Sequence, residues 1–144
     1  MIYADTSSLL KVFRPEELSE AVWKAIQDED LVIVSALTEL ETLVQLKAAW
    51  AGGILTRAQW RHAEARFAVL RNQPPFEFRA LPSRLFRTAL RQHRNSGDVH
   101  CRTLDRLHLA AMEELGVSRL MTHDEGQANA AKELGIKVIW PSHH

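Results

Sequence analysis

The sequence predicts an α/β fold with three layers, in which a mainly parallel sheet lies between helices on both faces. Short apolar segments rich in β-branched residues alternate along the chain with longer segments of helical periodicity. The segment 31–35 is apolar up to its final serine, which is typical of a strand that is buried on both faces. Because strands and helices alternate, the strands are expected to be joined by crossovers and to run parallel. With 144 residues, the chain is expected to form one domain, 1–144.

The first half of the chain is predicted to begin with a strand and to continue with helices and a second strand. The expected bounds are strand 2–4, helix 8–13, helix 16–28, strand 31–35, helix 38–51 and helix 56–71. Thr6 or Ser7 can cap the first helix. Pro15 either ends that helix or begins the next one, because proline suits a first helical turn.

Two capping boxes predict where the helices after the second strand begin. Thr38 would be an N-cap with Glu41 as its partner, and Thr56 would pair with Gln59 in the same way. A Gly-Gly pair separates the two helices and ends the first of them. The two helices are therefore expected to form a helical hairpin over about 38–71.

The second half of the chain continues the alternation. The expected bounds are edge strand 76–81, helix 84–94, helix from 103 toward 115, strand 119–123, helix 125–134 and strand 137–140. Ser83 and Thr103 are expected to cap the two helices that begin beside them. Gly116 and Gly135 are expected to end the last two helices.

The charge of the chain is balanced overall but unevenly distributed. The formal net charge is zero and the pI is about 7.1, so composition gives no general indication of nucleic-acid binding. Residues 51–106, however, carry eleven arginines and four acidic side chains, a net charge of +7. Arginine is well suited to bidentate contact with phosphate, although a solvated helical face would explain the same residues.

Several features suit a cytoplasmic protein. No apolar segment approaches the roughly 20 residues needed to cross a bilayer, so no membrane association is expected. The N-terminus lacks the arrangement of a signal peptide. The single cysteine, Cys101, cannot form an internal disulfide, which fits a reducing compartment.

Four carboxylates occupy similar places, where a predicted strand gives way to a helix. Asp5 and Asp124 follow strands, whereas Glu41 and Asp105 lie near the starts of helices. In an open α/β sheet these positions share one edge, where ligands bind. Four crowded anions would repel one another and raise some of their pKa values, and Mg²⁺ or Mn²⁺ would relieve the repulsion. The sequence therefore predicts a divalent-metal site, which suits the cleavage of phosphodiester bonds.

Each carboxylate also has a purely structural explanation. Asp5 could form an Asx turn, and Glu41 could complete its capping box. Asp105 and Asp124 could stabilise helix N-termini through the helix dipole. Glu39 competes with Glu41, because residues two apart on a helix point about 200° apart and only one can face the site. The joint placement of four acids at one edge favours a single acidic site.

Four segments of the chain resemble the PIN domain family in order and spacing. They are 3–11 (YADTSSLLK), 34–38 (VSALT) running to Glu41, 102–111 (RTLDRLHLAA) and 122–124 (THD) before a helix. The likeness is strongest to VapC-type toxins, the ribonuclease halves of bacterial or archaeal toxin–antitoxin pairs. The resemblance implies a PIN-like three-layer α/β/α sandwich and a metal-dependent endoribonuclease. It also implies Mg²⁺ or Mn²⁺, a homodimer and an antitoxin that blocks the site.

The resemblance assigns roles to individual residues. The acidic quartet of the family falls on Asp5, Glu41, Asp105 and Asp124, which would hold one or two metal ions. Ser7 and Thr122 match its polar supporting positions. The arginines of the 84–106 region are expected to hold the RNA backbone, and the candidates are Arg87, Arg91, Arg102 and Arg106. His108 and His123 lie near two of the acids and are expected to be packing or supporting partners.

Two other functions remain open from the sequence. A PIN-fold protein with little nuclease activity could serve mainly to bind a partner, with Trp23, Trp50 and Trp60 forming an exposed groove for an amphipathic helix. Ordinary core packing would explain these tryptophans equally well. A phosphoacceptor signalling domain would also carry acids at a sheet edge. A phosphatase that forms an aspartyl-phosphate is a separate possibility, and Ser7 argues against it because such an enzyme would need a second aspartate at that position.

Overall fold

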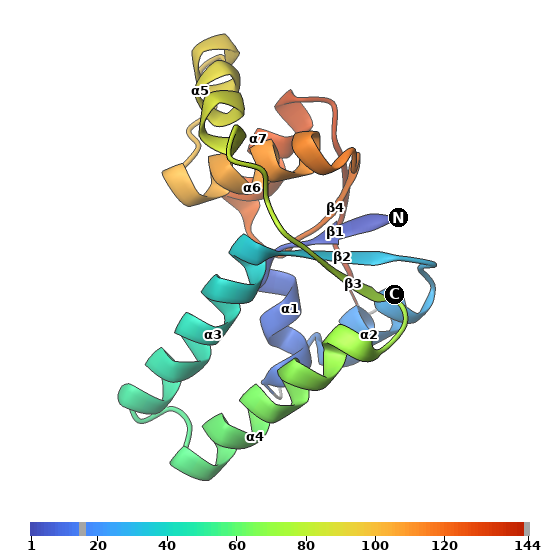
Figure 1. Ribbon diagram of the computed structural model, residues 1–144, viewed down its shortest axis with the longest axis vertical. Helices are drawn as coiled ribbons and strands as arrows, with labels where there is room; N and C mark the ends of the chain where they lie inside the picture. The colour runs from blue at the N-terminus through green and yellow to red at the C-terminus, as the bar shows by residue number, and fades with distance from the viewer. Residues whose placement is uncertain (15–16, 143–144) are drawn as a thin grey trace.

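The computed structural model describes residues 1–14 and 17–142, which form a five-stranded sheet between two layers of helices (Figure 1). Every strand pairing is parallel, and the strand order is β3-β2-β1-β4-β5. The strands are β1 Ile2–Ala4, β2 Val32–Ser35, β3 Phe76–Arg79, β4 Arg119–Met121 and β5 Lys137–Ile139. The predicted three-layer α/β sandwich is confirmed, including the edge position of the strand that begins at Phe76.

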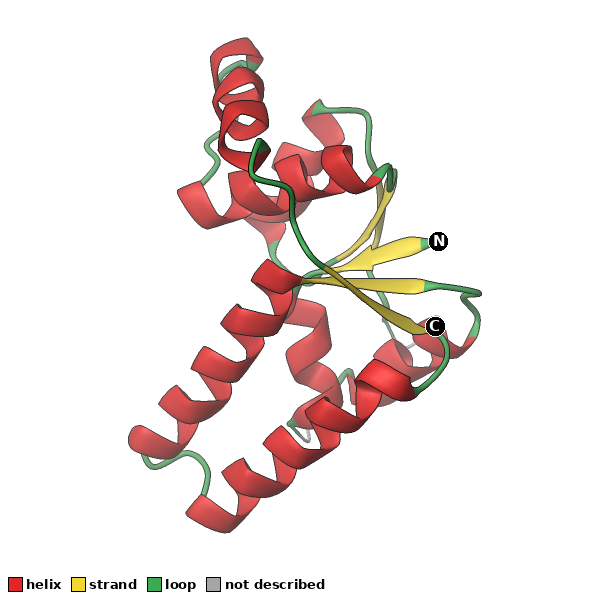
Figure 2. Ribbon diagram, in the orientation of Figure 1, coloured by secondary structure: helices red, strands yellow, loops and turns green. Residues whose placement is uncertain are grey.

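The helices divide into two groups on opposite faces of the sheet (Figure 2). One face carries α1 Thr6–Phe13, α2 Ser19–Gln27, α3 Ala36–Ala51 and α4 Arg57–Val69, which a short 3₁₀ helix follows over Leu70–Asn72. The other face carries α5 Leu85–Asn95, α6 Thr103–Leu115 and α7 Glu125–Glu133. Side chains alternate along each strand, so Ile2 and Ala4 pack in the core beside α1–α4, whereas Tyr3 packs beside α6.

The start of α3 differs from the prediction, and the difference bears on Glu41. Ser35 is the N-cap, and its hydroxyl accepts a hydrogen bond from the backbone N–H of Thr38 at 3.2 Å. Ser35 takes this role because the last residue of β2 is still extended, the conformation that an N-cap needs. The Thr38 hydroxyl instead donates to the Ala4 carbonyl at 3.1 Å. The predicted Thr38–Glu41 capping box is therefore wrong, and Glu41 lies in the second helical turn.

Other predicted helix ends have mixed outcomes. Asp5, rather than Thr6 or Ser7, caps α1, and neither α5 nor α6 has a side-chain cap, so Ser83 and Thr103 do not cap them. The capping box of Thr56 and Gln59 is present, and Gly116 ends α6 in the left-handed conformation. The predicted break at Pro15 lies outside the described residues.

The predicted helical hairpin is formed by α3 and α4, which project together from the sheet (Figure 1). Trp50 and Trp60 stack across it with ring centroids 4.4 Å apart, and Trp60 is buried. Trp23 packs edge-on against Phe76. These contacts contradict the exposed tryptophan groove considered above, because the indoles pack against the hydrophobic core. Within the described residues, no helix has both the length and the apolar character needed to cross a membrane.

Candidate active site

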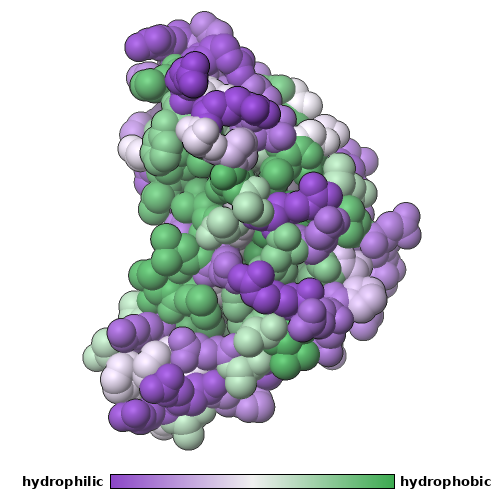
Figure 3. Space-filling view, in the orientation of Figure 1, coloured by the Kyte–Doolittle hydropathy of each residue, from purple (hydrophilic) through white to green (hydrophobic). Residues whose placement is uncertain are grey.

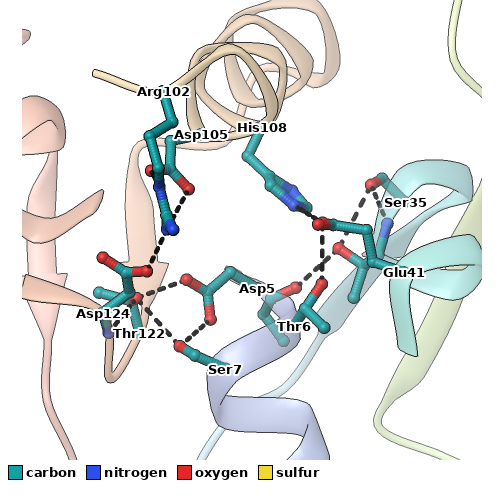
Figure 4. Close-up of polar contacts among 12 residues, drawn as sticks. Asp5, Thr6, Ser7, Ser35, Glu41, Arg102, Asp105, His108, Thr122 and Asp124 are labelled. Carbon is teal, nitrogen blue, oxygen red and sulfur yellow. Dashed lines mark hydrogen bonds and ion pairs between the residues drawn. The ribbon is translucent and has the colours of Figure 1, made fainter. Parts of the chain in front are cut away.

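The four predicted carboxylates line one cavity of about 250 Å³ at the carboxyl edge of the sheet (Figure 4). The topology explains this convergence for Asp5, Glu41 and Asp124, because β1 lies between β2 and β4 and the segments after all three strands meet at the centre of that edge. Asp105 does not follow a strand as expected, because it lies on α6, which follows α5. The β1–α1 junction, α3, α6 and the β4–α7 junction each contribute one acid. The lining residues are Asp5, Thr6, Ser7, Glu41, Gln45, Arg102, Asp105, His108 and Asp124.

Asp5 is the most deeply buried of the four acids, with 4% of its surface exposed. One carboxylate oxygen accepts hydrogen bonds from the Ser7 hydroxyl at 2.7 Å and from the Ser8 backbone N–H at 3.2 Å. The other accepts from the Thr122 hydroxyl. Burial raises the pKa of Asp5, and the hydrogen bonds from Thr122 and Ser7 offset part of the rise. The expected rise is therefore found, but its main cause is burial rather than repulsion among the acids.

Ser7 and Thr122 connect Asp5 to the segment after β4. The Ser7 hydroxyl accepts from the backbone N–H of His123 at 2.8 Å, and the Thr122 hydroxyl accepts from that of Asp124 at 3.0 Å. Each hydroxyl therefore donates to Asp5 and accepts from the β4–α7 junction. The two side chains hold the carboxylate of Asp5 in register with the loop that carries Asp124.

Glu41 is held by His108, which is itself buried. A carboxylate only accepts, so the imidazole Nε2–H donates to Glu41, and Thr6 donates to the same oxygen at 3.0 Å. Partial burial would raise the pKa of Glu41, but the hydrogen bond and charge of His108 and the bond from Thr6 outweigh it and lower the pKa. This environment favours the ionised form of Glu41.

A buried polar chain extends from His108 to the sheet. The Nδ1 atom of His108 lies 2.7 Å from the Tyr3 hydroxyl, which is 2.7 Å from the Ser35 hydroxyl. Burial raises the pKa of Tyr3, so its phenol stays protonated. The sequence indicated His108 as a supporting residue but not Tyr3 or Thr6. The one signal for Tyr3 was a hydroxyl-bearing side chain within the apolar segment 2–4.

Arg102 joins the two remaining acids. Its Nε atom donates to Asp105 at 2.9 Å, and its Nη2 atom donates to Asp124 at 2.6 Å (Figure 4). The guanidinium therefore lies among the carboxylates, although the sequence indicated only a contact with RNA. Asp124 also accepts from the backbone N–H of Gln127 at 3.0 Å. The capping explanation thus holds for Asp5 and Asp124, but their second carboxylate oxygens lie in hydrogen bonds within the site.

Other candidate residues lie outside the cavity. Glu39 forms an ion pair with Arg71, so of the two competing glutamates only Glu41 faces the site. Arg87 and Arg91 line a shallow depression along α5, and Arg91 forms an ion pair with Glu113. The prediction that Arg106 contacts RNA is wrong, because this residue is 6% exposed and its guanidinium donates to Gln92 at 3.3 Å.

The donor set of the cavity suits a hard divalent cation, because carboxylate and hydroxyl oxygens dominate it. Asp105 and Asp124 already share one cationic partner, the guanidinium of Arg102. In the ranges 1–14 and 17–142, no group of three His, Cys, Asp or Glu side chains has the spacing to hold an ion as it stands. Metal binding would therefore require the side chains that line the cavity to move. Arg102 can move away from the carboxylates because its side chain is largely exposed.

The raised pKa of Asp5 predicts how the stability of the metal-free protein depends on pH. The folded protein binds a proton at Asp5 more tightly than the unfolded chain, whose pKa is near 3.8. Stability from this group is therefore lost as pH rises through the raised pKa and regained as pH falls through it. Asp5→Asn removes this penalty, and asparagine is as good an N-cap as aspartate. In EDTA, the variant should be more stable than the parent at neutral pH, by a margin that shrinks toward pH 4.

Thermal unfolding of both proteins in EDTA at several pH values measures that margin. Glu41 contributes with the opposite sign, since its lowered pKa gives stability that is lost as pH falls below its ordinary value of 4.5. Comparing the two proteins at the same pH cancels this contribution. Equal stability of the two proteins at every pH would mean that Asp5 acts only as a helix cap, because asparagine caps a helix equally well.

Comparisons with known proteins agree with the observed fold. The family model of the PIN domain matches residues 2–133. Ribonuclease VapC46 of Mycobacterium tuberculosis (strain ATCC 25618 / H37Rv) is 31% identical over 143 residues, which cover 98% of each chain. Among solved structures, FitAcB from Neisseria gonorrhoeae superposes with a TM-score of 0.70 at 18% identity over the full length of both chains. The sarcin–ricin loop cleaving toxin VapC20 of M. tuberculosis superposes with a TM-score of 0.69 at 15% identity, over 90% of this chain and 95% of VapC20.

Proposed function

This chain belongs to the PIN domain family, and we propose that it is a metal-dependent endoribonuclease, the toxin of a toxin–antitoxin pair. The observation that carries the proposal is the single cavity lined by Asp5, Glu41, Asp105 and Asp124. A relative named as a ribonuclease that aligns over nearly the whole chain supports the same activity. The reaction is the hydrolysis of a phosphodiester bond in RNA.

The proposed cofactor is Mg²⁺ or Mn²⁺, held by Asp5, Glu41, Asp105 and Asp124. When bound, such an ion supplies activation of water and neutralisation of charge on the phosphate. The support for this choice is the oxygen-rich lining of the cavity, since imidazole and thiolate sites favour other metals. Burial makes ionised Asp5 costly without a cation, so a bound metal would offset that cost.

The supporting side chains fix the acids rather than react. Ser7 and Thr122 orient the Asp5 carboxylate through hydrogen bonds, and His108 orients Glu41 and keeps it ionised. Such outer partners typically change metal affinity or activity by roughly 10- to 100-fold when they are removed. Because these hydrogen bonds are made within the fold itself, they hold the carboxylates of Asp5 and Glu41 in fixed orientations.

Arginines near the cavity are proposed to hold the RNA backbone. Arg102 is 63% exposed in its side chain and borders the acidic cavity. Arg87 and Arg91 line a separate basic depression along α5, together with Arg84 and Arg94. Contacts of this kind bind phosphate without reading the base sequence, so they support RNA binding but do not identify the RNA.

The proposed partners are an antitoxin and a second copy of the chain. Large hydrophobic side chains are exposed on α3, α5 and α6, namely Leu40, Val44, Phe86, Leu90 and Leu104. Figure 3 shows hydrophobic residues on both sides of the hollow between α3 and the layer of α5 and α6. Surfaces of this kind commonly mark sites of protein association. We place the protein in the cytoplasm, where its unpaired Cys101 would stay reduced.

Paired glutamate variants test the proposed site. Glu41→Gln keeps an oxygen that can accept from His108 and Thr6 but removes the negative charge. We expect RNA cleavage in Mg²⁺ to fall by at least about 100-fold, with little change in melting temperature. Glu39→Gln removes only an exposed ion pair with Arg71, so its cleavage rate should match the parent and its stability should change by less than about 1 kcal/mol.

The readout is the initial rate of cleavage of a single-stranded RNA, with thermal unfolding of each variant as a check on folding. Near-normal cleavage by Glu41→Gln would contradict its role as a ligand. Loss of cleavage in Glu39→Gln instead would mean that the other glutamate serves the site.

A further inference from the structure

Arg102 is the one cationic side chain in the described residues that lines the acidic cavity, apart from the imidazole of His108. Its guanidinium donates from Nε to Asp105 and from Nη2 to both Asp105, at 3.4 Å, and Asp124, at 2.6 Å. In residues 1–14 and 17–142, its side chain makes hydrogen bonds with no other residue. The two carboxylates alone hold this arginine in place.

The same carboxylates are half of the proposed metal-binding set. An arginine is always protonated in proteins, so Arg102 offsets the repulsion between Asp105 and Asp124 while no metal is bound. A divalent cation that takes the same oxygens would lie within a few ångströms of the guanidinium and repel it. The two cations therefore cannot both keep their preferred contacts.

The side chain of Arg102 is placed so that its guanidinium can move away from Asp105 and Asp124. It is the N-cap residue of α6, and its backbone carbonyl accepts the first helical hydrogen bond from the Arg106 N–H at 2.9 Å. Its side chain takes no part in capping, and 63% of that side chain is exposed. The guanidinium can therefore swing away while the helix start remains intact, which the buried Arg106 cannot do.

We infer that Arg102 is a built-in counter-cation that a divalent metal must displace from Asp105 and Asp124 and that, once displaced, binds an RNA phosphate at the mouth of the cavity. This inference rests on the proposed metal-dependent function. It assigns Arg102 two successive partners, because a guanidinium can form the same bidentate bonds with a carboxylate or with a phosphate. Metal binding would thereby couple the assembly of the site to the capture of substrate.

Calorimetric titration with Mn²⁺ tests the competition. Wild type, Arg102→Gln and Arg84→Gln are titrated at the same pH and at low ionic strength. Arg84 is a matched control, because its side chain is 65% exposed, it pairs with Glu114, and it lies outside the cavity. We expect the dissociation constant of Mn²⁺ to fall by about tenfold in Arg102→Gln, since two partly exposed ion pairs no longer oppose binding. Arg84→Gln should bind Mn²⁺ like wild type.

The contribution of Arg102 to RNA binding should depend on metal. Affinity for a short single-stranded RNA is measured by rapid mixing, before cleavage begins, in buffer with Mg²⁺ and again in EDTA, and gel electrophoresis establishes that the RNA stays intact. Arg102→Gln should weaken RNA binding several-fold in Mg²⁺ and leave it almost unchanged in EDTA, where the wild-type guanidinium is held by the acids. Circular dichroism and melting temperature establish that all variants are folded.

The possible results of these two experiments distinguish a failure of the inference about Arg102 from a failure of the proposed metal-dependent function. Equal or weaker Mn²⁺ binding by Arg102→Gln would overturn the competition, and it would mean that Arg102 has no effect or positions the carboxylates for the metal. An equal loss of RNA affinity in Mg²⁺ and in EDTA would overturn the release of Arg102 to phosphate. If neither wild type nor Arg102→Gln binds Mn²⁺, the proposed metal site itself fails, and the inference fails with it.

Discussion

EDTA should abolish RNA cleavage by the purified protein, and excess Mg²⁺ or Mn²⁺ should restore it. Four carboxylates meet in one cavity, and among residues 1–14 and 17–142 no arginine or lysine other than Arg102 lines it to neutralise a phosphate. Without a divalent cation, the anionic acids would repel an anionic substrate. A divalent cation held by these carboxylates would remove this repulsion and would supply activation of water, so chelation should reduce the rate to the background of uncatalysed hydrolysis.

The measurement is the initial rate of cleavage of a single-stranded or looped RNA over a titration of chelator and added metal. A contaminating nuclease is the main competing explanation, so the Asp5→Asn protein purified in the same way serves as the blank. Cleavage that persists in excess EDTA, and that is absent from this blank, would contradict the metal-dependent mechanism.

Asp5→Asn should reduce cleavage by at least about 100-fold, the upper range for loss of an outer partner of a metal ligand, because here the ligand charge itself is removed. Asn keeps the shape of the side chain, and its carbonyl oxygen can still accept from the Ser8 N–H that caps α1. The bond from the Thr122 hydroxyl must rearrange, because the amide nitrogen of Asn is a donor. The fold should therefore persist while the site loses charge at its most buried position.

Asp28→Asn is the matched control for this substitution. Asp28 is exposed at the C-terminal end of α2, before β2 and therefore at the opposite edge of the sheet. It should retain full activity, and far-ultraviolet circular dichroism should be the same for both variants and the parent. A fully active Asp5→Asn protein would exclude Asp5 from the metal site, whatever its structural role.

Local patterns in the sequence were sufficient for the fold and for two of the four acids. Strand and helix periodicity depends on near neighbours, so the alternation of elements, the edge strand and the α3–α4 hairpin could be predicted before the structure was known. Asp5 and Asp124 follow from that alternation, because each comes after a parallel strand at its carboxyl end. Asp105 lies in the first turn of α6, which follows α5 and not a strand, so packing brings it to the same edge. The starts of helices were harder to predict from the sequence. Ser35 and not Thr38 caps α3, because the position of the cap depends on where the preceding strand stops being extended.

By itself the sequence thus determined a parallel α/β domain with an acidic site at one edge, because those features arise from local periodicity and from the direction of parallel strands. Tertiary structure alone decided between Glu41 and Glu39, since the face of α3 that meets the cavity depends on how the helix packs against the rest of the domain. It also decided that Arg106 is buried while Arg102 joins Asp105 to Asp124. Arg102 and Asp124 are 22 residues apart, and Asp5 and Thr122 are 117 apart. Hydrogen-bond partners at such separations are set by packing, which no local pattern encodes.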